Sequence, residues 1–84
     1  MTLRDLKIGK SGVVLEVGGT SGEASRTEKA LRRRLLEMGI TPRTTVTVKK
    51  AAPMGDPIEL LLRGYVLSLR LEDAQKITVE ETPS

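Results

Sequence analysis

Alternating apolar and polar positions recur along most of the chain, and this two-residue period is typical of β-strands with one buried face. The pattern predicts short strands at residues 13–17, 44–50, 58–62, 65–69 and 77–79. Gly and Pro separate several of these segments, as expected for turns. The side chains expected to face inward are Val46, Val48, Ile58, Leu60, Leu62, Tyr65, Leu67 and Leu69.

The apolar spacing changes to that of a helix after the first predicted strand. Leu31, Leu35 and Met38 lie at i, i+4 and i+7, which puts them on one helical stripe. Ser25 and Glu28 form an S-x-x-E capping box, in which each side chain accepts a backbone hydrogen bond of the other residue. The segment is therefore predicted to be an α-helix that begins after Ser25.

Glycines are expected to have structural roles at the end of this helix and in two turns. Gly39 follows the apolar stripe directly, as expected for a left-handed residue that ends a helix. Ile40 would then pack back on Leu35. Gly55 lies in the Pro-rich turn 53–57, and Gly64 separates two strands.

These elements predict a mainly β fold, a small barrel of about five strands with one helix between the first two. The last strand is expected to pair with the first and remove the free sheet edges. Residues 71–76 are expected to form one helical turn, and residues 3–8 are too short for a helix prediction. Residues 1–84 are interpreted as a single domain.

The composition excludes several kinds of chemistry. The 84 residues include no Cys and no His, which removes disulfides, zinc fingers, thiol nucleophiles and imidazole bases. The start of the chain has no apolar signal-peptide region, and no apolar run is long enough to cross a membrane. We therefore expect a cytoplasmic protein that is not an enzyme and is not inserted in a membrane.

Candidate cofactor sites are weak. Gly9-Lys10-Ser11 resembles the end of a phosphate-binding loop but lacks the earlier glycine, so it is interpreted as a turn. The carboxylates are scattered, and ferrous iron prefers some nitrogen or sulfur ligands. We expect no cofactor and no tight metal site, although weak ferrous iron binding by carboxylates is left open.

The run Arg32–Arg34 is the strongest basic feature, in a chain of net charge +3. Glu28 and Glu37 are spaced to pair with Arg32 and Arg33, which favours a solvated helix face. A small nucleic-acid-binding barrel that uses this face is the alternative function. Nucleic-acid barrels commonly stack bases on several aromatic side chains, and Tyr65 is the only aromatic residue here, so no nucleic-acid partner is expected.

Three segments resemble the FeoA family, in the same order along the chain: residues 31–42 (LRRRLLEMGITP), 52–59 (APMGDPIE) and 63–70 (RGYVLSLR). The opening Leu3-x-x-Leu6-x-x-Gly9 also fits. The resemblance implies an SH3-like barrel and a non-enzymatic, regulatory role in bacterial ferrous iron transport. It also implies a protein–protein interaction with FeoB, the membrane ferrous iron transporter, at its cytoplasmic face.

Four residues are candidates for partner binding. Leu36 points away from the apolar stripe of the helix, and Met54 lies at the tip of the turn 53–57. Arg33 and Asp56 would supply a polar rim. The partner is expected to be FeoB, and self-association is left open.

Overall fold

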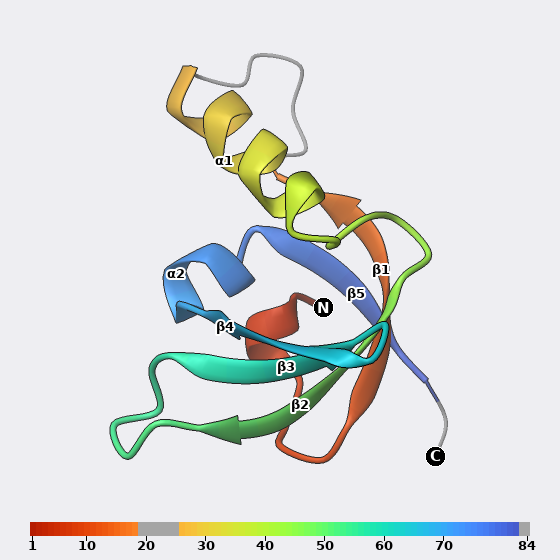
Figure 1. Ribbon diagram of the computed structural model, residues 1–84, viewed down its shortest axis with the longest axis vertical. Coiled ribbons are helices and arrows are strands. Elements are labelled where there is room, and N and C mark those ends of the chain that lie inside the picture. The colour runs from red at the N-terminus through yellow and green to blue at the C-terminus, as the bar shows by residue number, and fades with distance from the viewer. Residues whose placement is uncertain (19–25, 83–84) are drawn as a thin grey trace.

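The computed structural model describes residues 1–18 and 26–82 (Figure 1). A 3-10 helix at Leu3–Asp5 opens the chain. The strands are β1 (Ser11–Val17), β2 (Thr45–Ala51), β3 (Ile58–Leu62), β4 (Tyr65–Leu69) and β5 (Ile77–Glu81); the helices are α1 (Arg26–Glu37) and α2 (Leu71–Ala74). The predicted fold class is confirmed: α1 lies between the first two strands and the short α2 precedes the last.

The five strands form one antiparallel sheet in the order β4-β3-β2-β1-β5. The sheet curls around the core, and α1 lies at one end of it (Figure 1). The predicted pairing of the last strand with the first is confirmed, because β5 pairs with β1. The expected loss of both free edges is wrong, since β4 and β5 are the two ends of the strand order and do not pair. The barrel therefore stays open between these two strands.

The core is aliphatic, as the composition requires. The strand side chains that are buried are Val14, Val17, Val46, Val48, Ile58, Leu60, Leu62, Leu69, Ile77 and Val79. Every predicted inward residue of β2 and β3 is among them. Leu67 of β4 is only half-buried.

The inward prediction for Tyr65 is wrong, because its side chain is 42% exposed. Tyr65 is the first residue of an edge strand, and its hydroxyl donates a hydrogen bond to the backbone carbonyl of Met38 at the end of α1. A phenol needs such a polar partner, which the aliphatic core does not offer. The ring therefore spans from the sheet to the helix end instead of joining the core.

Helix α1 ends in the geometry that its sequence predicts. Gly39 has a φ of 97°, which a glycine adopts at little cost. The N–H of Ile40 donates to the carbonyl of Leu35 at 3.0 Å, and the N–H of Gly39 donates to that of Leu36 at 3.1 Å. These two bonds are a Schellman motif, and they satisfy carbonyls that the helix end would otherwise leave open. Ser25 lies outside the described residues, so the predicted Ser25–Glu28 capping box is not described.

The first residues form one more helical turn than the sequence analysis assigned. The backbone N–H and the hydroxyl of Thr2 both donate to Asp5 Oδ2, at 2.9 and 3.2 Å. The backbone bond from Thr2 is the main reason why the pKa of the Asp5 carboxyl lies below its ordinary value of 3.8. The turn carries Leu3 into the core, where it is fully buried.

Candidate functional site

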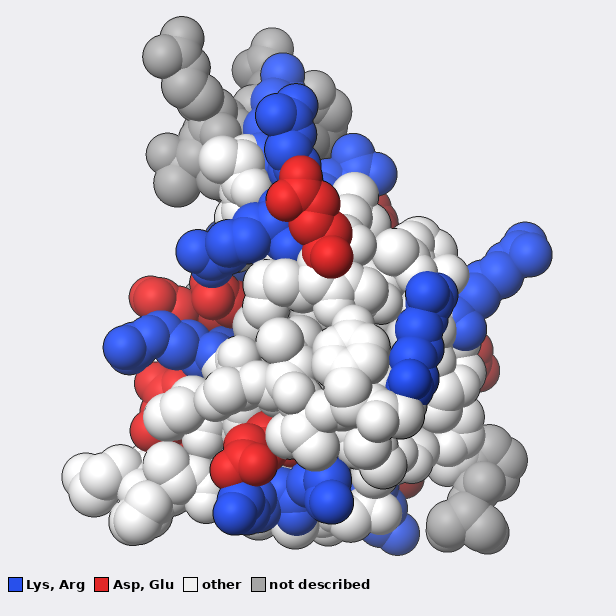
Figure 2. Space-filling view, viewed as in Figure 1, with Lys and Arg blue, Asp and Glu red and all other residues white. Residues whose placement is uncertain are grey.

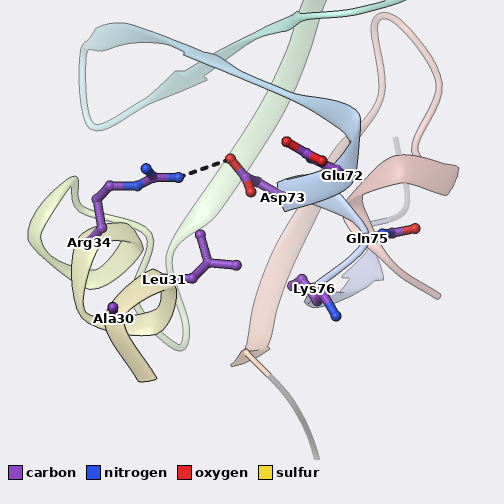
Figure 3. Close-up of a pocket in the computed structure, with 7 residues that line it drawn as sticks. All are labelled: Ala30, Leu31, Arg34, Glu72, Asp73, Gln75 and Lys76. Carbon is purple, nitrogen blue, oxygen red and sulfur yellow. Dashed lines mark hydrogen bonds and ion pairs between the residues drawn. The ribbon is translucent and has the colours of Figure 1, made fainter. Parts of the chain in front are cut away.

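A groove of about 500 Å³ runs between α1 and α2 (Figure 3). Ala30, Leu31 and Arg34 line it from the side of α1, and Glu72, Asp73, Gln75 and Lys76 line it from the other side. Arg34 reaches across, and its Nη2 lies 3.1 Å from Asp73 Oδ2. Leu31 projects into the space beside this ion pair (Figure 3). The groove thus has an apolar side, and one ion pair joins the two helices across it.

The described residues that line the groove do not form a metal-binding cluster. Across residues 1–18 and 26–82, no group of three or more His, Cys, Asp or Glu side chains is placed to hold a metal ion. Glu72 and Asp73 are adjacent carboxylates, and Asp73 is occupied by Arg34. The groove offers contact area and charge, which suit the binding of another molecule.

The outward side of α1 carries a second, shallower hollow, lined by Lys29, Arg32, Arg33, Leu36 and Glu37. Figure 2 shows basic side chains gathered over α1 at the top of the molecule, with an acidic side chain among them. Leu36 is half-buried and packs against the core cluster, while Arg33 is exposed. These two candidate residues therefore share one surface, with an apolar side chain between cations.

The predicted ion pair between Arg33 and Glu37 is wrong, since these two described residues form no ion pair. Both side chains are exposed, and water solvates such charges well enough that i, i+4 pairing contributes little. Arg34 of α1 does form an ion pair, with Asp73, a residue 39 positions away. Among the described carboxylates, none forms an ion pair with Arg33.

The turn between β2 and β3 presents Met54, whose side chain is 92% exposed. Gly55 follows it with a φ of 84°. Asp56 Oδ1 accepts the backbone N–H of Leu71 at 3.0 Å, at the start of α2. One oxygen of Asp56 therefore anchors the turn to α2, so Asp56 also has a structural contact that the sequence analysis did not assign.

The four candidate residues form two surfaces instead of one. Arg33 and Leu36 lie on α1, whereas Met54 and Asp56 lie in the β2–β3 turn, which Figure 1 places at a different end of the molecule. Gly64 lies apart from both, in the β3–β4 hairpin, with a φ of 85°. Three contacts join segments that are distant in the sequence, so no local pattern predicts them. They are those of Arg34 with Asp73, of Tyr65 with Met38 and of Asp56 with Leu71.

No helix in the described part of the chain combines the length and the apolarity that a membrane crossing needs. Its longest helix, α1, has 12 residues and a charged outward side.

Known proteins similar to this chain agree with its fold. The crystal structure of Stenotrophomonas maltophilia FeoA complexed with zinc, described as a procaryotic SH3 domain protein, superposes with a TM-score of 0.77 at 27% identity, over 95% of this chain and 89% of that one. An NMR structure of a FeoA-like protein from Clostridium acetobutylicum has a TM-score of 0.83 and 36% identity, over 100% and 88% of the two chains. The SH3-like fold is therefore confirmed.

One relative of this chain is a fusion of two proteins. It is the Fe(2+) transport protein A/Fe(2+) transporter FeoB fusion protein of Porphyromonas gingivalis, 39% identical over 80 residues. The match covers 95% of this chain and only 8% of that protein. The profile of the FeoA domain matches residues 1–81. With nearly the whole sequence matched and the fold shared, the chain belongs to the FeoA domain family.

Proposed function

We propose that the chain is a non-enzymatic accessory and regulatory protein of bacterial ferrous iron uptake, a single cytoplasmic domain over residues 1–84 that docks to the FeoB transporter. The observation that carries the proposal is the Porphyromonas gingivalis fusion, in which a segment 39% identical to this chain is joined to a FeoB transporter. Covalent linkage fixes a one-to-one ratio and a high effective concentration. Such an arrangement is useful when the two parts act on each other.

The two surfaces described above are the proposed contacts. Met54 is almost fully exposed on a turn that contains two prolines, so it would lose little chain entropy on docking. Leu36 lies beside Arg33 in the hollow on α1, which gives an apolar anchor next to a cation. Asp56 borders Met54 and keeps part of its carboxylate free for a donor.

Iron is, in this proposal, the cargo of the transporter and not a resident group of this chain. The chain has no Cys and no His to supply the nitrogen or sulfur that ferrous iron favours. Anaerobic calorimetry with ferrous iron is expected to detect weak binding at most. A one-to-one site with sub-micromolar affinity would contradict this part of the proposal.

The proposal is tested by the affinity of the chain for detergent-solubilised FeoB from the same cell. Arg33→Glu and Met54→Glu change exposed side chains and are expected to leave the fold intact while weakening binding. Ile8→Glu is the matched control, because Ile8 is an apolar residue with 61% exposure on another turn. Saturable binding that Arg33→Glu or Met54→Glu weakens and Ile8→Glu does not is the expected result. Absence of binding by the parent would overturn the proposal.

Leu36→Glu is a sharper but riskier variant, since Leu36 packs partly against the core. It is interpreted only if its circular dichroism and melting temperature match those of the parent. If it unfolds, Leu36 belongs to the core, and the contact on α1 is then judged from Arg33→Glu.

The nucleic-acid alternative is tested with the same protein. A phosphate binder loses affinity steeply as salt rises. We expect no such salt-dependent binding to duplex or single-stranded nucleic acid, because one arginine of the run is paired with Asp73 and Tyr65 is hydrogen-bonded to α1.

A further inference from the structure

The two edges of the sheet are protected to different degrees. On β5, Thr78 forms a bridge with Thr2, and the N–H of Val79 donates to the carbonyl of Met1 at 2.9 Å. The N-terminal segment thus covers part of that edge. Strand β4 pairs with β3 on one side, and on the other side no strand from residues 1–18 or 26–82 adjoins it.

The register of the β3–β4 hairpin identifies which backbone groups of β4 are left open. Arg63 and Gly64 have φ values of 49° and 85°, the pattern of a two-residue type I′ turn. Such a turn makes Leu62 and Tyr65 a hydrogen-bonded pair, so Leu67 and Leu69 also bond to β3. The N–H and C=O groups of Val66 and Ser68 therefore point away from β3, toward the open edge.

Strand β4 lacks the features by which proteins usually keep an edge from pairing. Its sequence, Tyr-Val-Leu-Ser-Leu, contains no Lys, no other charge and no Pro. The β1–β5 and β2–β3 ladders each contain a register shift, whereas the β3–β4 ladder runs without one. Val66 is 50% exposed, and the middle of the molecule where Figure 1 draws β3 and β4 is largely free of charged side chains in Figure 2. This edge is open and suited to accept another strand.

We propose that β4 pairs antiparallel with β4 of a second copy of this chain, about a two-fold axis at Leu67. The register then places Val66 opposite Ser68 of the other copy, so the open groups of each residue bond to the other. Leu67 meets its own copy in the non-hydrogen-bonded position, where side chains approach most closely. The two sheets become one continuous sheet.

Charge complementarity favours a second copy in this orientation. Arg63 lies at the hairpin end of β4, where its guanidinium donates to the hydroxyls of Thr41 and Thr44, each at 3.1 Å, and to no carboxylate of the described chain. Asp56 and Glu72 lie at the other end of β4, where α2 begins. Arg70, the residue before α2, is at the same end. The antiparallel two-fold brings the hairpin end of each copy opposite the α2 end of the other. Each Arg63 would thus face the Asp56 side of the other copy, and the two-fold axis makes this contact occur twice.

The test uses the chain alone, so its failure leaves the proposed docking to FeoB untouched. Sedimentation equilibrium is measured from micromolar to millimolar protein, with Ser68→Pro as the main variant. Proline at residue 68 removes an outward N–H and no bond to β3, which is where an edge strand tolerates it. The lost hydrogen bonds, one from each copy, are expected to weaken dimerisation about tenfold or more.

A second edge variant and a control keep the result interpretable. Ser68→Lys places a charge at the edge without changing the backbone and should also weaken dimerisation. Leu61→Lys places the same charge on β3, beside the edge strand, and should leave the dimerisation affinity largely unchanged. The amides of Val66 and Ser68 should gain protection from hydrogen exchange as concentration rises.

A chain that stays monomeric at millimolar concentration would overturn the proposal. So would a dimer that both Ser68 variants leave unchanged while they remain folded. Protection of Val66 and Ser68 that develops only when FeoB is added would assign the edge to the transporter and would also overturn pairing with a second copy.

Discussion

Helix α1 and the five-stranded sheet contribute to the protein in different ways. The strands supply most of the buried side chains, whereas among the described side chains of α1, residues 29–37, Leu35 alone is buried. Leu31 and Leu36 are half-buried, and the rest are exposed. The sheet therefore accounts for most of the stability, and the helix is left with a large surface for contacts with other molecules.

Several of the described contacts that hold the helix lie near its C-terminal end. The Schellman bonds of Gly39 and Ile40 fix the chain as it leaves α1, and the hydroxyl of Tyr65 binds the carbonyl of Met38. The ion pair between Arg34 and Asp73 adds a link to α2. A helix attached in this way presents its outward residues without needing them for the fold, which is the property that docking requires.

The largest effect is expected from the sheet. Leu60 is fully buried in β3, and Leu60→Ala is expected to lower the free energy of unfolding by about 2–5 kcal/mol. Leu31→Ala, at a half-buried position of α1, should cause a clearly smaller loss. Urea denaturation of both variants measures the difference. Equal losses would mean that α1 is as much a part of the core as the sheet is.

The next largest loss of stability is expected at the junction between α1 and the sheet. Gly39→Ala forces a side chain into a left-handed conformation, and its Cβ would collide with the Tyr65 hydroxyl. The expected loss is at least about 1 kcal/mol. Tyr65→Phe removes the obstructing oxygen, so Gly39→Ala should cost less in that background. An unchanged melting temperature of Gly39→Ala would refute the role of Gly39 in ending the helix.

A smaller effect is expected where α1 meets α2. The side chains of Arg34 and Asp73 are 61% and 16% exposed, so their ion pair is expected to contribute about 0.2–1 kcal/mol. A double-mutant cycle with Arg34→Ala and Asp73→Ala measures the coupling energy, which should fall as salt is added. Coupling that salt leaves unchanged would indicate a contact better shielded from water than this one.

The smallest effect is expected in the N-terminal turn, which packs against α2. The folded pKa of Asp5 is lowered, so its carboxylate stabilises the fold above pH 3.8, and this contribution is lost as the pH falls through the folded pKa. Asp5→Asn should be less stable than the parent at neutral pH, and the difference should vanish in acid. Melting temperatures across this pH range provide the measurement. A difference that persists in acid would assign the effect to something other than the charge.

Much of the fold is predictable because its signals are local. The alternation of Val46 and Val48 gives the inward face of β2, and the stripe ending at Gly39 gives the end of α1. The turn at residues 2–5 is too short for a helix prediction from periodicity, although Thr2 and Asp5 have the spacing of a capping box. The inward prediction for Tyr65 fails because alternation predicts a face of the strand but does not show that the strand lies at an edge beside a helix end.

The candidate site is less predictable, because it depends on which segments meet. The separation of Leu36 from Met54 and the bond from Leu71 to Asp56 follow from the curl of the sheet. The sequence contains the side chains of both surfaces but not the distance between them. The resemblance to the FeoA family supplied the partner class, and the fold then placed each candidate residue.

The most direct test of docking is a map of amide chemical shifts for the labelled chain titrated with FeoB. We expect shift changes or line broadening centred on α1 around Arg33 and on the β2–β3 turn around Met54, with the buried positions of β2 largely unaffected. A spectrum that does not change at saturating FeoB, or changes confined to residues far from both surfaces, would contradict it.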